Sequence, residues 1–206
     1  RIEVDSNTNQ YTTNLEIKVP RNTNLILDSY WDGVIKVSQV SGEMNLRSQN
    51  NDISMINVSG SAKVWSYNGN VVAVFDAVTV SKPLNFESYN GSVDLKLPAD
   101  IRATVSFGTK TGMMLTDFDI KNLEDAVRVK STKQDGLEIK FDELVKGEIN
   151  GGGQSLKIET EKGDIRLRKH KNQPAASMKR LMQELNPDNH PEGFSAAGGH
   201  GLDARL

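Results

Sequence analysis

A short turn-like phrase recurs along the chain about every 20 residues, and this repeat constrains the fold more than any other feature. Each copy begins at a position here called the anchor, which is a small residue in every copy except the one at Phe107, continues through Asn, Asp or Gly, and ends with an aliphatic residue, as in Ser66–Val71 and Ser88–Val93. Anchors stand at positions 29, 48, 66, 88, 107, 131 and 160. A period of this length is typical of solenoid proteins, in which each unit packs against its neighbours.

The residues before each anchor alternate between apolar and polar. The position directly before the anchor is polar in every copy except one, where it is Trp65. A period of two indicates a strand with one buried and one solvated face. The apolar columns, four and two residues before the anchors, are Leu25, Leu27, Met44, Leu46, Ala62, Val64, Leu84, Phe86, Ala103, Val105, Val127, Val129, Leu156 and Ile158. Glycines that can adopt φ > 0 are predicted in the turns at Gly33, Gly69, Gly91, Gly112, Gly136 and Gly163.

Together these patterns predict an all-β fold, a β-solenoid of about seven coils over residues 1–170. A β-sandwich is the alternative, since short strands spaced by 8–12 residues also suit it. Residues 11–20 alternate cleanly and predict a strand that ends at Pro20. After Lys171 the composition changes abruptly, and residues 171–206 are predicted to be a weakly ordered tail with a short helix from Pro174; a helix that docks on a partner is the alternative.

Composition excludes several classes of function. The 25 Lys and Arg residues balance 27 Asp and Glu residues, so no basic surface predicts a nucleic-acid partner. The absence of cysteine excludes disulfides, thiol catalysis and cysteine-type zinc sites. The histidines, His170, His190 and His200, all lie in the last fifth of the chain. We therefore predict no metal, no cofactor and no catalytic residue, and no apolar run approaches the roughly 20 residues of a transmembrane helix.

Several short motifs also occur in a characteristic order. They are Val19–Leu25, the repeated Val-Ser-Gly and Tyr-Asn-Gly units, Ile149–Gly153, and Lys162–Arg166 as a closing strand. Over residues 1–170 this order resembles the bacterial putative-adhesin domain family of unknown function. The resemblance implies a right-handed, single-stranded β-helix-like solenoid, found in envelope or secreted proteins. It also implies a binding or scaffold role, and it carries over no catalytic residues.

Aromatic residues supply the candidate ligand-binding site. Tyr30, Tyr67 and Tyr89 all follow an anchor directly, Trp31 is next to the first of them, and Trp65 lies on the solvated strand face. Tyr67 and Tyr89 would lie on adjacent coils, where their rings can stack. Such stacking either only stabilises the coils or forms a platform for a glycan or an envelope protein. We expect a non-enzymatic surface, secreted or periplasmic adhesin or scaffold, whose signal segment has been removed.

A carbohydrate-active enzyme on a β-helix scaffold is the alternative function. Glycoside hydrolysis uses paired carboxylates, and a concave groove lined by facing carboxylates would favour an enzyme. An aromatic, convex face would favour binding. Turns and solvated strand faces commonly carry such residues, so the binding role is preferred. The closely spaced carboxylates are Asp94 and Asp100, Asp117 and Asp119, and Glu124 and Asp125.

Overall fold

The computed structural model describes residues 14–31, 33–124, 128–133, 136–140 and 144–170. Within these ranges the regular structure is entirely β, with thirteen strands in one sheet and two in another. The predicted all-β class is therefore confirmed. The tail at 171–206 and its predicted helix lie outside the described residues. No helix able to span a membrane occurs in the ranges just given.

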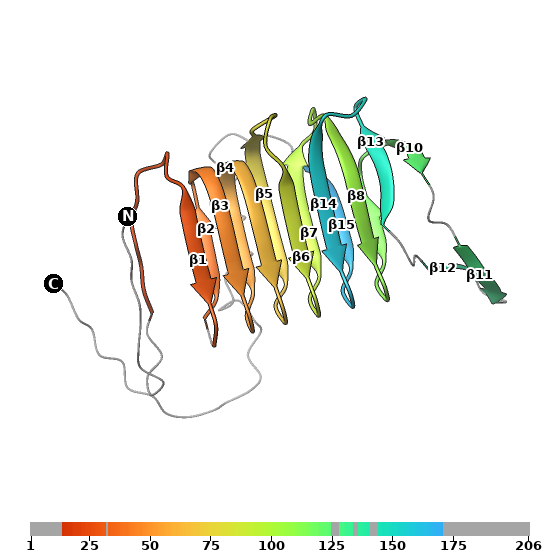
Figure 1. The fold of residues 1–206 in the computed structure, drawn as a ribbon, viewed down its shortest axis with the longest axis horizontal. Coiled ribbons are helices and arrows are strands. Elements are labelled where there is room, and N and C mark those ends of the chain that lie inside the picture. The colour runs from red at the N-terminus through yellow and green to blue at the C-terminus, as the bar shows by residue number, and fades with distance from the viewer. Residues whose placement is uncertain (1–13, 32, 125–127, 134–135, 141–143, 171–206) are drawn as a thin grey trace, which may run out of the picture. The chain divides into compact units, whose positions relative to one another are not determined.

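The strands of the large sheet form two ladders of parallel strands that share strand β4 (Figure 1). The parallel part of the first ladder contains, in spatial order, β1 (Leu25–Ser29), β3 (Ser41–Ser48), the second half of β4 (Ile53–Ser66), β6 (Leu84–Ser88), β14 (Gln154–Thr160) and β8 (Ala103–Thr109). The second ladder contains β2 (Ile35–Ser38), the first half of β4, β5 (Val71–Val78), β7 (Val93–Pro98), β15 (Ile165–His170) and β9 (Met114–Thr116).

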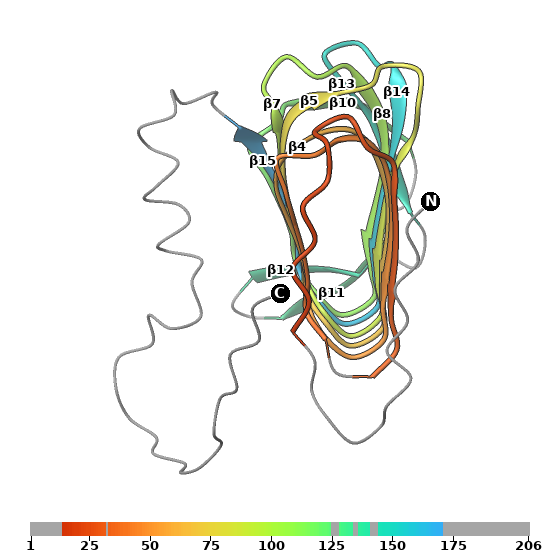
Figure 2. The same cartoon turned by 90° about the vertical axis from the view of Figure 1, so that its left-hand side faces the viewer.

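The core lies between the two ladders, which face each other as opposite walls in Figure 2. The apolar columns predicted from the repeat point inward. Leu46, Phe86 and Ile158 are completely buried, and only the first strand has partly buried members, at Leu25 and Leu27. Val127 lies outside the described residues, and the side chain at Val129 is not described. Each fully buried aliphatic or aromatic side chain contributes about 1.5–3 kcal/mol to stability.

The order of strands in space differs from their order along the chain. The last strand pair inserts between earlier ones, because β14 pairs with both β6 and β8, and β15 pairs with both β7 and β9. The sequence-based expectation that 162–166 closes the end of the stack is therefore wrong. The outer side of β8 is covered instead by β13 (Val145–Ile149), which pairs with it antiparallel, and β13 in turn pairs with β10 (Ile120–Glu124).

Two further expectations about the strands are also wrong. The repeat copy at position 131 does not join either ladder, because β11 (Arg128–Lys133) and β12 (Gly136–Lys140) pair with each other as an antiparallel hairpin. Six of the seven repeat copies therefore lie in the parallel ladders. Residues 14–20 do not form a strand, and residues 11–13 lie outside the described part of the chain.

Buried hydroxyl groups connect the later turns to their neighbours, whereas those of Ser48 and Ser66 bond within their own turns. The Ser88 hydroxyl accepts the N–H of Gly91 in its own turn and donates to the carbonyl of Gly69 in the adjoining turn, both at 3.0 Å. Thr160 makes the same pair of hydrogen bonds with Gly163 and Gly91, at 3.2 and 2.8 Å. At these two positions a small hydroxyl residue is required because it satisfies buried backbone groups of two turns at once.

The turn glycines are needed for close approach between turns rather than for left-handed backbone. A Cβ atom added at Gly91 would overlap the carbonyl oxygen of Gly69, and Gly163 meets Gly91 in the same way. The prediction of φ > 0 is wrong for these turns, because Gly33, Gly69, Gly91, Gly112 and Gly163 all lie outside the left-handed region and Gly136 begins strand β12. Among the described residues, the glycines that do adopt positive φ are Gly42, Gly60, Gly151, Gly152 and Gly153.

Candidate binding surface

Three of the five predicted aromatic residues form one cluster on the outer side of the first ladder. The rings of Tyr67 and Tyr89 stack with centroids 4.9 Å apart and an interplanar angle of 7°. Trp65 lies beside Tyr67, with a centroid distance of 6.2 Å. The predicted stacking on neighbouring turns is confirmed. We call Trp65, Tyr67 and Tyr89 the aromatic cluster.

Tyr30 and Trp31 do not belong to the aromatic cluster. They follow strand β1, and their side chains are 64% and 74% exposed. Ser29 pairs with Ser48, so the residue that follows in the next turn is Gln49, and it interrupts the aromatic column between Tyr30 and Tyr67. The repeat correctly predicted the position of Tyr30 in its turn but not a ring–ring contact for it.

Cations flank the aromatic cluster at both ends. The Arg47 guanidinium lies 5.1 Å from the centre of the Trp65 ring, and the Lys162 ammonium lies 5.6 Å from the centre of the Tyr89 ring. Such cation–π contacts hold the Trp65 and Tyr89 rings in place and put a charged group over each ring.

A surface hollow of about 420 Å³ adjoins the aromatic cluster. One row of paired residues runs across strands β4, β6, β14 and β8 and contains, in that order, Trp65, Glu87, Glu159 and Gly108. The hollow lies where this row ends, because Gly108 has no side chain to fill the space. We call it the glutamate hollow. Its lining is Trp65, Glu87, Ser88, Tyr89, Gly108, Thr109, Lys110, Leu144, Glu159, Thr160 and Glu161.

Lysines from neighbouring strands hold the carboxylates of the hollow in their charged form. Partial burial opposes ionisation of Glu87, but hydrogen bonds from Lys157 at 3.1 Å and Asn85 at 3.0 Å outweigh it and lower the pKa of Glu87. Hydrogen bonds from Lys110 and Tyr89 lower the pKa of Glu161. The hollow therefore contains ionised carboxylates at neutral pH.

The lysine and tyrosine side chains that donate hydrogen bonds to these carboxylates keep their protons. A hydrogen bond to Glu161 raises the pKa of Lys110 and also that of Tyr89. Lys157 has a raised pKa through its hydrogen bond to Glu159, although partial burial opposes the shift. The ammonium groups stay protonated and the phenol stays neutral, so the surface offers fixed donors and acceptors beside the aromatic cluster.

An acid-stability measurement tests the interaction of Glu87. A lowered folded-state pKa means that the contribution of Glu87 is complete above the ordinary glutamate pKa of 4.5 and is lost as the pH falls through the lower, folded-state pKa. Glu87→Gln should therefore lower stability at pH 7 by less than about 1 kcal/mol, a small value because the side chain is 33% exposed. Below the folded-state pKa of Glu87 the variant and the parent should converge in urea unfolding. Glu16→Gln, at a carboxylate 83% exposed, serves as the control, and equal pH dependence in both variants would contradict the interaction.

Sequence reasoning missed Glu87, Lys110, Glu159 and Glu161 as members of one site. Residues 87 and 159 are neighbours only because β14 inserts beside β6, and no spacing along the chain reports this insertion. The other carboxylates singled out from the sequence do not join the hollow: Asp94 pairs with Arg168, Asp117 accepts the N–H of Lys169, and Asp125 lies outside the described residues. Among the side chains that the structure describes, no group of three His, Asp or Glu residues is arranged to hold a metal.

Comparison with known proteins gives one structural likeness. No family model and no curated protein matches the chain. A crystal structure of a putative cell adhesion protein from Clostridium sporogenes aligns with a TM-score of 0.46 at 10% sequence identity. The alignment covers 73% of this chain and 93% of that protein.

Proposed function

We propose that this chain is a non-enzymatic, adhesin-like binding scaffold of the bacterial cell envelope or exterior, and that the aromatic cluster and the glutamate hollow bind a glycan. In this proposal the two ladders are successive coils of a right-handed β-solenoid. The observation that carries it is the stacked, partly exposed Tyr67–Tyr89 pair beside a hollow of about 420 Å³ lined by charged donors and acceptors.

Strand pairing supports the solenoid over the sandwich. Sandwiches are built mainly from antiparallel strands joined by hairpins. Here each ladder consists of six strands, and every strand is paired in parallel with its neighbours. Equivalent residues of successive turns lie in columns, as the anchor hydroxyls do. A coil that repeats its path produces such columns directly.

The chemistry of the surface suits a polyhydroxylated ligand. Ligand sites typically combine flat apolar faces with a few fixed polar groups. Here the exposed edges of the stacked Tyr67 and Tyr89 rings, whose facing surfaces cover each other, can contact the apolar side of a sugar ring. Ionised carboxylates at Glu87 and Glu161 accept hydrogen bonds from hydroxyl groups, and the Lys110 ammonium donates them.

Protonation states favour binding over the alternative role as a glycan-cleaving enzyme. The hollow does contain facing carboxylates with lysines beside them, which is the feature expected of an enzyme. A glycosidase, however, needs one carboxyl group with a raised pKa as its general acid. The pKa values of Glu87 and Glu161 are lowered and that of Lys110 is raised, so these groups are poised neither to donate nor to accept a proton near neutral pH.

A glycan array provides the test of the proposed function. Trp65→Ala combined with Tyr67→Ala should reduce glycan binding by at least tenfold, because buried or stacked Trp and Tyr side chains commonly contribute about 2 kcal/mol or more to an interface. The thermal midpoint should stay nearly unchanged, since Tyr67 is 40% exposed and Trp65 is only partly buried. Tyr30→Ala with Trp31→Ala removes the same types of ring outside the aromatic cluster and should leave binding intact. Equal binding by parent and Trp65/Tyr67 variant would refute the proposal.

A further inference from the structure

The strand pair β14–β15 occupies a slot between parts of the chain that precede it. On one side lie β6 and β7, on the other β8 and β9, and all four contacts are parallel. The inward side chains of the inserted pair, such as Leu156 and Leu167, are at most 2% exposed. Without this pair, the faces that enclose the slot would lose both their backbone hydrogen bonds and their apolar cover. We call residues 154–170 the inserted element.

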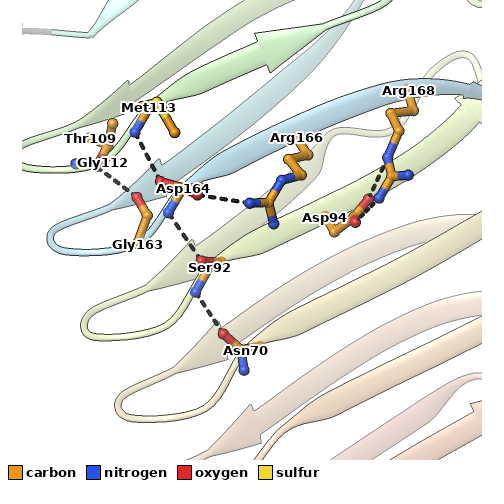
Figure 3. Close-up of polar contacts among 10 residues, drawn as sticks. All are labelled: Asn70, Ser92, Asp94, Thr109, Gly112, Met113, Gly163, Asp164, Arg166 and Arg168. Carbon is orange, nitrogen blue, oxygen red and sulfur yellow. Dashed lines mark hydrogen bonds and ion pairs between the residues drawn. The ribbon is translucent and has the colours of Figure 1, made fainter. Parts of the chain in front are cut away.

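Side chains of the inserted element contact both walls of the slot. Toward β6 and β7, Lys157 pairs with Glu87 at 3.1 Å, and Arg168 forms a two-pronged contact with Asp94 (Figure 3). Toward the other wall, Glu161 pairs with Lys110. These ionic contacts favour the inserted element over another strand in the same place, because each one joins opposite charges on two neighbouring segments.

A polar column through the turns also runs across the inserted element. Asp164 donates its N–H to the Ser92 hydroxyl on one side at 3.0 Å, and its carboxylate accepts the N–H of Met113 on the other side at 3.0 Å (Figure 3). Ser92 in turn donates its N–H to the Asn70 side chain at 2.9 Å. The inserted element thus supplies one link of a column that otherwise belongs to earlier turns.

A glycine hinge precedes the inserted element. Asn150 and the three glycines 151–153 have consecutive φ values of 49°, 81°, 75° and 159°, which is left-handed backbone throughout. This segment carries the chain from β13, on one side of β8, to β14 on the other. Glycine makes several backbone paths accessible at low cost, so this segment can adopt a different path in a swapped form. In the closed form its path is held by hydrogen bonds from the Asn150 side chain to the Ala99 and Ile101 carbonyls and from the Gln154 N–H to the Arg102 carbonyl.

We propose that residues 154–170 are an exchangeable element, which a second copy of this chain can supply to the slot. Every contact within the slot is the same whether the element comes from its own chain or from another copy. The closed monomer and the swapped dimer then differ only in the path of the hinge and in the free energy of bringing two chains together, which depends on protein concentration. This is the usual basis of domain swapping. This inference concerns self-association and does not depend on glycan binding.

A charge-reversal mixing experiment on the full chain tests exchange. One variant changes the slot, with Glu87→Lys and Asp94→Arg; the other changes the inserted element, with Lys157→Glu and Arg168→Asp. Each variant alone places like charges together, whereas a swapped heterodimer restores opposite charges in both slots. The two variants, one isotopically labelled, are refolded separately and together, and the species are measured by native mass spectrometry and light scattering.

We expect the mixture to form heterodimer at least tenfold more than either variant forms homodimer, a factor that corresponds to about 1.4 kcal/mol. The four changes combined in one chain restore the pairs internally, and that control should be mainly monomeric. A mixture containing no more dimer than the separate variants would overturn the proposal.

A second experiment retains the native charges on the slot walls. The chain contains no cysteine, so copies carrying Ser92→Cys and copies carrying Asp164→Cys can be mixed, refolded and oxidised. Residues 92 and 164 adjoin each other only across the slot, and exchange should give disulfide-linked heterodimer at least tenfold above the mismatched pair Lys36→Cys with Asp164→Cys. Equal yields from the matched and mismatched pairs would overturn the proposal.

Discussion

Replacing Gly91 with alanine should lower the free energy of unfolding by about 3 kcal/mol or more, because the new methyl group has no space. A Cβ atom at this position would overlap the Gly69 carbonyl oxygen and would lie 2.8 Å from the Asn70 nitrogen. Both are backbone atoms of the adjoining turn, so neither can rotate away. Relief requires the two turns to separate, which would also stretch the hydrogen bond between the Ser88 hydroxyl and Gly69.

Gly33→Ala is the matched control for Gly91→Ala. Gly33 occupies the same place in the first turn, but the nearest atom to its added Cβ is the Ser29 hydroxyl oxygen, at 2.9 Å. That side chain can rotate, so we expect a loss below about 1 kcal/mol. Urea unfolding of both variants, followed by tryptophan fluorescence, makes the comparison. Equal losses would show that the turns are not packed as closely as the structure places them.

Local patterns in the sequence predicted the inner and outer faces of the strands well. Phe86 and Glu87 alternate between core and solvent because strand geometry imposes a period of two on any half-buried chain. The same repeat correctly placed Tyr67 and Tyr89 on neighbouring turns with stacked rings. These features depend only on spacing within a unit and on the contact of one unit with the next.

The position of the last strand pair could not be predicted, because the repeat copies have nearly the same motif. The anchor of the copy predicted at position 107 lies two residues later, because Thr109 and not Phe107 pairs with the anchor Thr160. Thr109 and Thr160 both present a hydroxyl group, so either could follow Ser88. Charge distinguishes them: with β8 beside β6, Glu87 would face Gly108, whereas β14 brings Lys157 within 3.1 Å of it. Such complementarity between residues 70 positions apart has no signature along the chain. The glutamate hollow depends on this order and was missed for the same reason.

Replacing Ile158 with aspartate should have the largest effect of any substitution considered, with a loss of about 4 kcal/mol or more. Ile158 is completely buried in the middle of β14, where it pairs with Phe86 on one side and Phe107 on the other. An unpaired carboxylate there must either lose its hydration or pull the strand out of the slot. Among the strands that the structure describes, β8, β13 and β10 are linked to β6 by strand pairing only through β14. Loss of β14 from its place should therefore release these three strands together.

Ser155→Asp is the control for the position of β14, since it places the same charge on the exposed face of the same strand. Its effect on stability should stay within about 0.5 kcal/mol. Amide hydrogen exchange measured by mass spectrometry separates local from general destabilisation: in Ile158→Asp, protection should fall most in β8 and β13, while β3, β4 and β5 keep more of theirs. The reason is that β3, β4 and β5 pair with one another without any contribution from β14. Unchanged protection of β8 and β13, or equal damage from both substitutions, would contradict the insertion of β14 between β6 and β8.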